Sequence, residues 1–362
     1  MKYIDEYRDP EIAGGLLAGI EKLSRQLARP VTIMEVCGSH TQAIGRYGIR
    51  KMLPDGIRLI SGPGCPVCVT SVQDVDTALW LAAQPNVIFT TFGDMLRVPG
   101  TGSRSLQQLR AEGADIRVVA SAADCIGLAL ENPQREIIFM GIGFETTSPT
   151  IAATVVTVQK KQLKNLTVFS VHKVIPPAIK ALIDDPALQI DGFLCPGHVS
   201  IITGADAYRC ITDAGLAAVI TGFEPVDVLE GIYMLLRQLQ EKEKEVVIQY
   251  GRGVKKEGNH KALELLEKVF IPSDARWRGL GVIPGSGLAF RDSFADFDAL
   301  RKFTVPELAS EEIKGCRCGD ILRGIIEPPA CPLFRKICTP NNPTGPCMVS
   351  SEGTCAAYYR YL

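Results

Sequence analysis

The sequence predicts an α/β protein with two similar open parallel-sheet lobes and a third, cysteine-rich unit at the C-terminus. Three observations support this fold class. Short apolar runs alternate with amphipathic segments from about residue 30 to residue 245, and such alternation is typical of parallel sheets in α/β domains. Most of the runs are apolar throughout, as expected of strands that are covered on both faces. Finally, half of the 12 cysteines follow residue 315.

Eight short runs that are rich in Val, Ile or Phe are the predicted strands. They span residues 31–36, 58–61, 86–91, 116–121, 136–142, 166–171, 192–195 and 216–221. Amphipathic segments between them predict helices at residues 71–83, 148–161 and 224–239. After a charged run at 240–245, the sequence predicts one more strand, one more helix and a Gly/Pro-rich stretch at 277–290.

Three pairs of similar motifs recur in the same order along the chain. They are MEVCGSHT (34–41) with GIGFETT (141–147), SGPGC (61–65) with LCPGH (194–198), and TFGDMLRV (91–98) with TGFEPVDVL (221–229). The recurrence predicts lobes at 29–134 and 135–243, although any two α/β lobes share glycines at their strand ends. We expect the third unit to comprise residues 244–362 together with an N-terminal helix within residues 1–28.

Composition narrows the classes of function. The formal net charge of −1 gives no overall field that would attract nucleic acid or an anionic membrane. The chain has no apolar run near the roughly 18–20 residues of a membrane span, and its polar, acidic start is unlike a secretory signal. We therefore expect a cytoplasmic protein that is monomeric on its own. Because thiols stay reduced in the cytosol, the cysteines predict metal binding or redox chemistry.

The cysteine-dense tail predicts a metal centre. It is rich in Pro and Gly and has little apolar periodicity, so it needs a crosslink to fold. Thiolates suit iron–sulfur clusters or zinc, and the lack of paired CxxC knuckles favours iron–sulfur; inert or disulfide-bonded cysteines are the third alternative. The predicted ligands of a [4Fe–4S] cluster are Cys318, Cys331, Cys338 and Cys355, with Cys316 and Cys347 as substitutes.

A second group of thiols lies near the N-terminus. Cys37 follows the first predicted strand, and His40 enters the next helix. The two side chains could share a metal ion, or the histidine could activate the thiol; alternatively, Cys37 is a small buried residue. Cys65 and Cys68 form a CxxC in a Gly/Pro turn after the second strand, which suits a redox pair or two metal ligands but also arises by chance. We expect these residues at one carboxyl edge of a sheet, where α/β proteins bind ligands.

Further polar residues follow other predicted strands. They are Asp94, Glu145, Thr146, Thr147 and His198. They are candidates for the same kind of edge, and the amides of the GFETT turn could hold an anion; alternatively, these residues are ordinary helix caps. The chain has no GxxxxGK[ST] motif and no GxGxxG after a strand, so the sequence predicts metals and thiols but no organic cofactor.

Six motifs span nearly the whole chain: CGSHT (37–41), GPGCPVC (62–68), GFETTSPT (143–150), PGHVSIITG (196–204), GFEPVDVL (222–229) and MVSSEGTCAAYY (348–359). Together they resemble the HypD family of [NiFe] hydrogenase maturation factors. The resemblance implies two α/β lobes and a cluster-bearing third domain. It also implies a complex with a small HypC-type chaperone, which assembles the Fe(CN)2CO unit of the hydrogenase, and a HypE-type partner that delivers the cyanide ligands.

By the same resemblance, Cys37 would hold a transient Fe(II) that carries CN and CO, together with a thiol from the HypC-type partner, and His40 would lie beside it. Cys65 and Cys68 would be a redox pair linked to the [4Fe–4S] cluster, in surroundings similar to those of ferredoxin:thioredoxin reductase. The strand-end residues Glu145 to Thr147 and His198 would position the cyanide donor or dock partners. The predicted function is thus an assembly scaffold. The alternatives are a cluster-driven thiol–disulfide oxidoreductase and an adaptor whose cluster is only structural.

Overall fold

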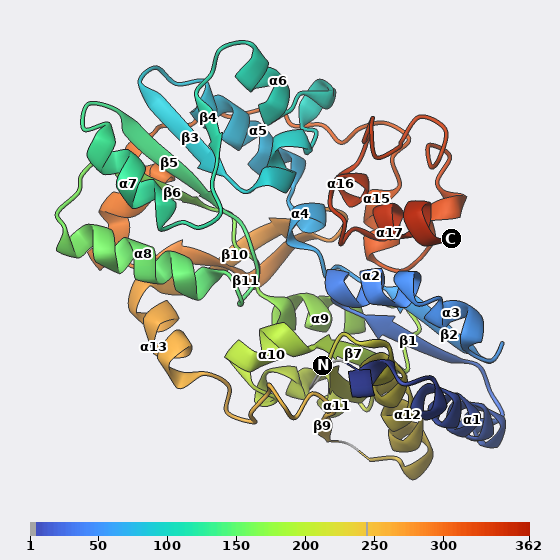
Figure 1. Cartoon of the computed structure of the whole chain (residues 1–362). Coiled ribbons are helices and arrows are strands. Elements are labelled where there is room, and N and C mark those ends of the chain that lie inside the picture. The colour runs from blue at the N-terminus through green and yellow to red at the C-terminus, as the bar shows by residue number, and fades with distance from the viewer. Residues whose placement is uncertain (1–4, 244) are drawn as a thin grey trace.

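A computed structural model describes residues 5–243 and 245–362 of the chain. It contains two parallel β-sheets, a long antiparallel hairpin and a C-terminal region of short helices and loops (Figure 1). The predicted α/β class with parallel sheets is therefore confirmed. All eight predicted strands are present, with ends that shift by at most three residues.

The first sheet has five parallel strands in the order β2-β1-β7-β8-β9. The strands are β1 (Val31–Glu35), β2 (Ile57–Ser61), β7 (Gly192–Pro196), β8 (Ala217–Thr221) and β9 (Val246–Ile248). Glu35 at the end of β1 lies opposite Ser61 of β2 and Leu194 of β7. The carboxyl ends of these strands therefore meet at one edge, where loops from distant parts of the chain come together.

The second sheet has four parallel strands in the order β4-β3-β5-β6. The strands are β3 (Val87–Thr91), β4 (Ile116–Val118), β5 (Glu136–Gly141) and β6 (Leu166–Ser170). All five residues of β3 are buried, which agrees with the continuous apolar runs in the sequence and with helices on both faces.

The sheets do not follow the expected lobe boundary at residues 134/135. The chain leaves the first sheet after β2, builds the whole second sheet from β3 to β6, and returns to the first sheet with β7 and β8. Both structural lobes are therefore discontinuous in sequence. Consecutive strands are neighbours in only about two-thirds of cases, so chain order alone was a poor guide to which strands share a sheet.

Helices cover both sheets, and the three helices predicted between strands are all present. Around the first sheet lie α1 (Pro10–Leu27), α2 (Gly38–Arg46), α3 (Ile49–Met52), α10 (Gly197–Thr203), α11 (Arg209–Asp213) and α12 (Pro225–Glu241). Around the second lie α5 (Val72–Ala82), α6 (Leu106–Ala111), α7 (Asp124–Glu131), α8 (Ser148–Lys160), α13 (His260–Val269) and α14 (Ala299–Lys302). Two others, α4 (Pro66–Val69) and α9 (Ile175–Ile183), lie between the sheets (Figure 1).

The sequence analysis predicted that the N-terminal helix joins the C-terminal unit, but in the structure helix α1 does not. It packs along α12, and its buried residues Ile20 and Leu23 share an apolar cluster with Val31 and Ile33 of β1. The amphipathic face of α1 is thus part of the core of the first lobe. Amphipathicity predicts that a helix is covered on one face, but not which neighbour covers it.

The Gly/Pro-rich stretch at 277–290 forms most of a β-hairpin that the sequence analysis missed. Strand β10 (Phe270–Trp277) pairs antiparallel with β11 (Gly281–Phe290). Gly279 in the turn has a φ of +78°, a conformation that favours glycine. The hairpin reaches from the second sheet towards the C-terminal region (Figure 1), and Thr70 forms an isolated bridge with Trp277.

The C-terminal region lies against the carboxyl edge of the first sheet. Its helices are α15 (Cys318–Leu322), α16 (Pro346–Val349) and α17 (Thr354–Tyr361). Helix α17 packs on α2, and α16 packs on α4, so the cysteine-rich tail lies beside the N-terminal motifs (Figure 1). Within the residues that the structure describes, no helix is long and apolar enough to cross a membrane.

Candidate metal and thiol site

Cys37 stands at the carboxyl edge of the first sheet. It immediately precedes α2, and its side chain is buried, with 1% of the residue exposed. His198, at the start of α10 beyond β7, lies against it: the Cys37 Sγ is 3.8 Å from Nδ1 and 3.9 Å from Nε2 of His198. The structure therefore brings a thiol and an imidazole together from positions 161 residues apart in the chain.

His40 has a different position from the one that its spacing suggested. Its Nε2 donates a hydrogen bond to the carbonyl oxygen of Gly222 at 2.9 Å and lies 3.0 Å from the Thr221 Oγ1. The ring of Phe223 lies next to both histidines, with ring centroids 4.8 Å from His40 and 5.1 Å from His198. His40 thus joins α2 to the end of β8, while His198 is the imidazole that faces the sulfur of Cys37.

The surroundings of Cys37 disfavour its thiolate. Burial raises the pKa of the Cys37 thiol well above its ordinary value, and the nearby charge of Glu352 raises it further, whereas the backbone N–H of His40 opposes the shift. Burial also lowers the pKa of His198 and of His40 to about 4. At neutral pH the Cys37 thiol and the His198 imidazole are therefore both uncharged. Binding of a cation would be needed for the thiol to lose its proton.

Two glycines allow the loops to approach Cys37. The Gly38 N–H donates to the Gly64 carbonyl at 2.9 Å, and a Cβ on Gly64 would lie 2.1 Å from the backbone nitrogen of Cys37. A Cβ on Gly38 would lie 2.4 Å from the Cβ of Glu352. No other residue fits at these positions without moving the backbone, which explains the glycines in CGSHT and GPGC.

Two carboxylates near Cys37 were missed by the sequence analysis. Glu35 is fully buried at the end of β1, where it accepts hydrogen bonds from the Cys37 N–H at 3.1 Å and from the Thr41 hydroxyl. Burial raises the pKa of Glu35 to about 7. Glu352, from the C-terminal tail, accepts a hydrogen bond from the Ser39 hydroxyl at 2.7 Å. A charged residue inside an apolar strand run was the available signal for Glu35, but no local pattern indicates Glu352.

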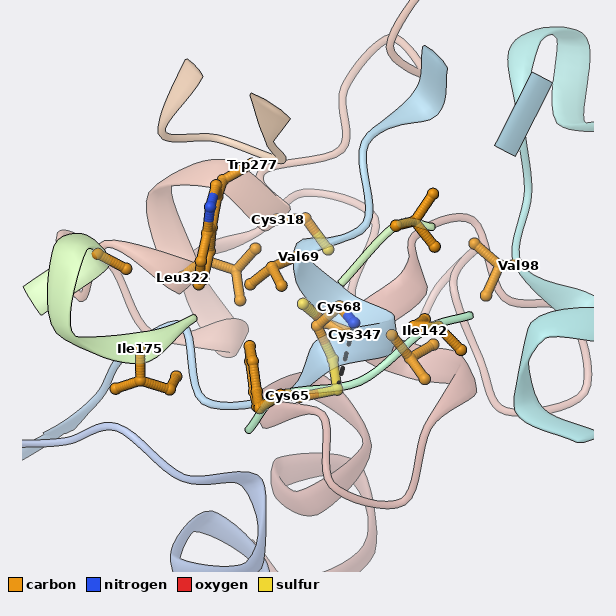
Figure 2. Packing of buried hydrophobic residues seen from close by; sticks show 14 of the residues in the cluster. Cys65, Cys68, Val69, Val98, Ile142, Ile175, Trp277, Cys318, Leu322 and Cys347 are labelled. Atoms are coloured by element: carbon orange, nitrogen blue, oxygen red, sulfur yellow. Dashed lines mark hydrogen bonds between the residues drawn. A yellow bond between two sulfur atoms is a disulfide. The ribbon is translucent and has the colours of Figure 1, made fainter. Parts of the chain in front are cut away.

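The CxxC lies at the start of α4, with Cys65 directly before the helix and Cys68 within it, and it is oxidised in this structure. Cys65 and Cys68 form a disulfide, and both residues are buried. The predicted pair is thus close enough for dithiol–disulfide chemistry, and it directly follows the Gly64 that touches Cys37. Figure 2 shows the pair together with Cys318 and Cys347 from the tail. Cys347 belongs to α16, which packs on α4.

The remaining tail cysteines surround a small cavity. It is lined by Cys316, Cys318, Cys331, Cys338 and Cys355 with only glycine and apolar neighbours, among them Phe334 and Met348. All four predicted ligands therefore line one cavity, together with Cys316. Cys347 is buried and is not part of the lining, but its side chain contacts those of Cys318 and Cys355. The backbone N–H of Thr344 donates to the Cys338 sulfur at 3.3 Å. This all-thiol, apolar donor set fits an iron–sulfur cluster.

The cavity is small, and its cysteines do not form a site for a single ion. Its volume of about 10 Å³ admits about one water-sized sphere. Across residues 5–243 and 245–362, no three His, Cys, Asp or Glu side chains form a group that could hold one metal ion. Binding of a cluster would therefore require the cysteine side chains to move outwards from their positions here.

The predicted polar residues after β3 and β5 lie at the edge of the second sheet, and not beside Cys37. Glu145 is buried, and its Oε1 accepts a hydrogen bond from the Ile175 N–H at 2.8 Å at the start of α9. Thr147 directly precedes α8, Thr146 is partly buried beside it, and Asp94 is exposed. For Glu145 the helix-cap alternative thus has direct geometric support. Its Oε2 is buried without a partner among the described residues.

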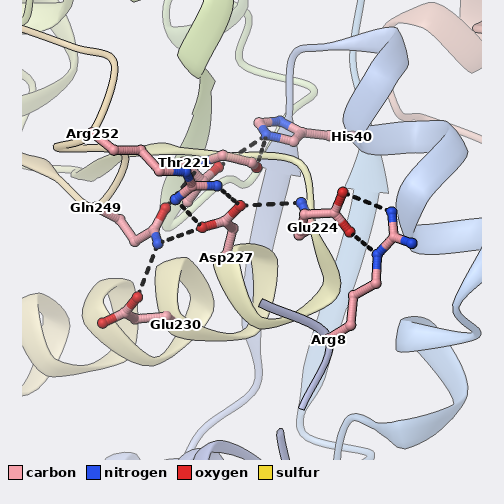
Figure 3. A network of polar contacts seen from close by, with 9 residues as sticks. Arg8, His40, Thr221, Glu224, Asp227, Glu230, Gln249 and Arg252 are labelled. Atoms are coloured by element: carbon pink, nitrogen blue, oxygen red, sulfur yellow. Dashed lines mark hydrogen bonds and ion pairs between the residues drawn. The ribbon is translucent and has the colours of Figure 1, made fainter. Parts of the chain in front are cut away.

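A network of polar contacts lies around the start of α12, close to His40 (Figure 3). Arg252 makes a paired contact with the buried carboxylate of Asp227, and it lies 3.8 Å from the ring centroid of Tyr7. Phe223, Glu224, Tyr250 and Arg252 line an open cavity of about 640 Å³. Because Phe223 also touches both histidines, this cavity begins one side chain away from the Cys37–His198 pair.

The fold and the site together define a class of protein: an α/β protein that carries a buried cysteine–histidine pair, a disulfide and a cysteine-lined cavity along one sheet edge. A family model named HypD, described as "Hydrogenase formation hypA family", matches residues 11–362. The chain therefore belongs to the HypD family, whose members are hydrogenase maturation factors.

Individual relatives agree along the full length of the chain. It is 47% identical over 368 residues to the hydrogenase expression/formation protein HupD of Azotobacter chroococcum, covering 100% of this chain and 97% of that protein. It is 46% identical to HypD of Rhodobacter capsulatus and 43% identical to HypD of Escherichia coli, in each case covering 100% of this chain and 98% of the relative.

Proposed function

We propose that this protein is an assembly scaffold that holds Fe(II) as cargo at Cys37 while the CN and CO ligands of the [NiFe] hydrogenase Fe(CN)2CO centre are attached. The observation that carries the proposal is the contact between the Cys37 sulfur and the His198 ring, at 3.8 Å. It lies at the carboxyl edge of the sheet, where α/β proteins commonly bind ligands. Soft donors such as thiolate suit iron. The Glu35 and Glu352 carboxylates near Cys37 favour a cation there.

In this proposal the scaffold works in the cytoplasm with two partners. A small HypC-type chaperone supplies a second thiol to the iron, and a HypE-type protein delivers cyanide. The cavity of about 640 Å³ beside Phe223 offers an open approach to the site. Neither nucleic acid nor a membrane has a part in the proposal, and the chain alone is a monomer.

The C-terminal cysteines would hold a [4Fe–4S] cluster, for which Cys318, Cys331, Cys338 and Cys355 remain our proposed ligands and Cys316 is equally well placed around the cavity. Such a cluster supplies one-electron chemistry when it is bound. Reduction of the Cys65–Cys68 disulfide to two thiols takes two electrons and two protons. Cys347 lies on the side of the tail that packs against α4, which supports a redox link between the tail and the CxxC.

The test is infrared spectroscopy of the protein purified anaerobically with its small partner. We expect bands for metal-bound CN and CO in the wild-type complex and none in Cys37→Ala. The matched control is Cys125→Ala, because Cys125 is also buried but lies under the second sheet, where it contacts Thr90. Equal bands in Cys37→Ala and wild type would show that the iron is held elsewhere.

The second candidate function is a cluster-driven thiol–disulfide oxidoreductase. The observation that favours it is the Cys65–Cys68 disulfide beside the cysteine-rich tail. This function requires the CxxC but not Cys37. A Cys37→Ala variant that supports hydrogenase maturation, with maturation lost in Cys65→Ser, would favour the oxidoreductase over the scaffold.

A further inference from the structure

Arg278 is a buried cation that is attached to the CxxC segment. It follows β10 in the turn of the hairpin and is 3% exposed. Its backbone N–H donates to the Val69 carbonyl at 2.9 Å, and its Nε donates to the Thr70 carbonyl at 2.9 Å. Val69 and Thr70 directly follow Cys68, so these hydrogen bonds attach the backbone of Arg278 and its guanidinium to the end of α4.

The other side of Arg278 faces the cysteine-rich tail. Its Nη1 pairs with the Glu312 Oε2 at 3.0 Å. In the same turn, a Cβ on Gly279 would lie 2.2 Å from the Cα of Gly319, so the hairpin tip packs directly on the residue after Cys318. The charge of Arg278 also acts on Cys316, which lines the cysteine cavity. Arg278 thus lies between the CxxC segment and the cysteine cavity.

The positive charge of Arg278 is only partly compensated. Its Nη2 is buried and has no hydrogen-bond partner within residues 5–243 and 245–362. Its ion-pair partner Glu312 has a side chain that is 59% exposed, so water screens that carboxylate. Among the residues that the structure describes, no charged side chain lines the cysteine cavity itself. The positive charge of Arg278 is therefore only partly neutralised, and it lies near a cavity whose cysteines would be negatively charged as thiolates.

We propose that Arg278 is a positioning residue that keeps one positive charge beside the C-terminal cluster and thereby raises the reduction potential of that cluster. The inference rests on the cluster of the proposed function. A cluster with four thiolate ligands is negatively charged, and it gains one more negative charge when it accepts one electron. The guanidinium of Arg278 attracts this added negative charge. Burial strengthens its attraction for the added charge.

The experiment compares full-length protein carrying a reconstituted cluster, titrated with dithionite and followed by electron paramagnetic resonance. Arg278→Met removes the charge and keeps an unbranched side chain. Arg276→Met is the matched control, because Arg276 is two residues away and exposed. We expect Arg278→Met to lower the equilibrium constant for reduction of the cluster about tenfold, which lowers the reduction potential by about 59 mV for a one-electron couple. The reduction potential of Arg276→Met should equal that of the wild type. A loaded Arg278→Met protein with the wild-type potential overturns the proposal.

A second pair of variants tests the opposite sign and does not alter a buried residue. Glu312→Gln removes the partner charge of Arg278, so the potential should rise, by less than Arg278→Met lowers it. Glu311→Gln, at the neighbouring exposed glutamate, is the control. If the Arg278→Met protein binds no cluster, the Glu312→Gln variant provides the test. A cluster reduction potential in Glu312→Gln that is equal to or lower than that in Glu311→Gln overturns the role of Arg278. If the wild-type protein itself binds no cluster, the proposed function fails and this inference fails with it.

Discussion

Burial sets the chemistry of Cys37. Because burial and the charge of Glu352 hold the pKa of this thiol well above its ordinary value, the thiol is protonated throughout the neutral range. The facing imidazole of His198 is neutral in the same range, because burial lowers its pKa to about 4. Binding of a cation by the thiolate must therefore release one proton, which comes from the sulfur and not from the ring.

The first prediction concerns the pH dependence of Fe(II) uptake. One proton is released from Cys37 for each iron bound, so the apparent affinity should rise about tenfold per pH unit between pH 7 and pH 8. Below pH 7 the rise should be steeper, because Glu35, with a pKa of about 7, is then also protonated. Anaerobic Fe(II) titrations at three pH values measure the slope, with Cys37→Ala as the control. An affinity that does not change with pH would show that Cys37 is not a ligand.

The second prediction concerns Glu145. Burial raises the pKa of this carboxyl to about 7 from an ordinary value of 4.5, so the native state binds the proton more tightly than the unfolded state. Stability contributed by this group is therefore present at low pH and is lost as the pH rises towards 7. Glutamine resembles the protonated acid and can still accept from the Ile175 N–H. The free energy of unfolding of Glu145→Gln, relative to that of the wild type, should therefore increase by about 2–3 kcal/mol from pH 5 to pH 8.

Urea denaturation at pH 5 and pH 8 measures this difference. Glu257→Gln, at an exposed glutamate, is the control and should show no such gain. If the free energies of unfolding of Glu145→Gln and wild type differ equally at the two pH values, the carboxyl of Glu145 is not protonated in the native state at pH 5.

At the scale of elements, the packing of α1 on α12 decides what the N-terminal segment stabilises. Ile20 of α1 is fully buried in the cluster that includes β1, whereas Ile12 on the same helix is 46% exposed. Ile20→Ala should therefore lower the free energy of unfolding by about 2–5 kcal/mol, and Ile12→Ala should change it by less than about 1 kcal/mol.

Chemical denaturation followed by circular dichroism measures both α1 variants. Hydrogen exchange of Ile20→Ala should show weaker protection in β1 and α12. Weaker protection confined to residues 316–362 would mean instead that α1 packs on the C-terminal region, as the sequence alone had suggested.

At the scale of the whole molecule, the two sheets and the tail differ in what stabilises them. Each sheet lies within large apolar clusters, whereas residues 304–314 contain no regular secondary structure and the tail helices have eight residues or fewer. Removal of iron and sulfide by a chelator under reducing conditions should therefore increase hydrogen exchange in residues 316–355 by about tenfold or more, because a metal centre that binds only folded protein stabilises it.

Hydrogen exchange with mass spectrometry, before and after chelation, tests this last prediction. Protection of β1, β3, β5 and β8 should persist after chelation, since each of these strands contributes buried side chains to two apolar clusters. Exchange that increases equally in the sheets and the tail would show that the chain has a single cooperative unit that depends on the cluster.

The amino-acid sequence by itself determined the local structure and the chemistry of this protein. Apolar runs predicted all eight strands up to β8, because a strand covered on both faces must be apolar along its length. The spacing of Cys65 and Cys68 predicted a pair that can form a disulfide, because three residues of a tight turn bring two sulfurs together. The cysteine-dense tail predicted a thiol cluster, and the motifs identified the family.

Only the tertiary structure decided which distant residues meet. The chain interleaves its two sheets, so β7 returns beside β1 and carries His198, and not His40, to the sulfur of Cys37. The tail brings Glu352 to the same edge, and the missed hairpin brings Arg278 between the CxxC and the cysteine cavity. Local patterns report burial and periodicity, whereas these contacts depend on strand order and on packing between segments far apart in the sequence, which no local pattern encodes.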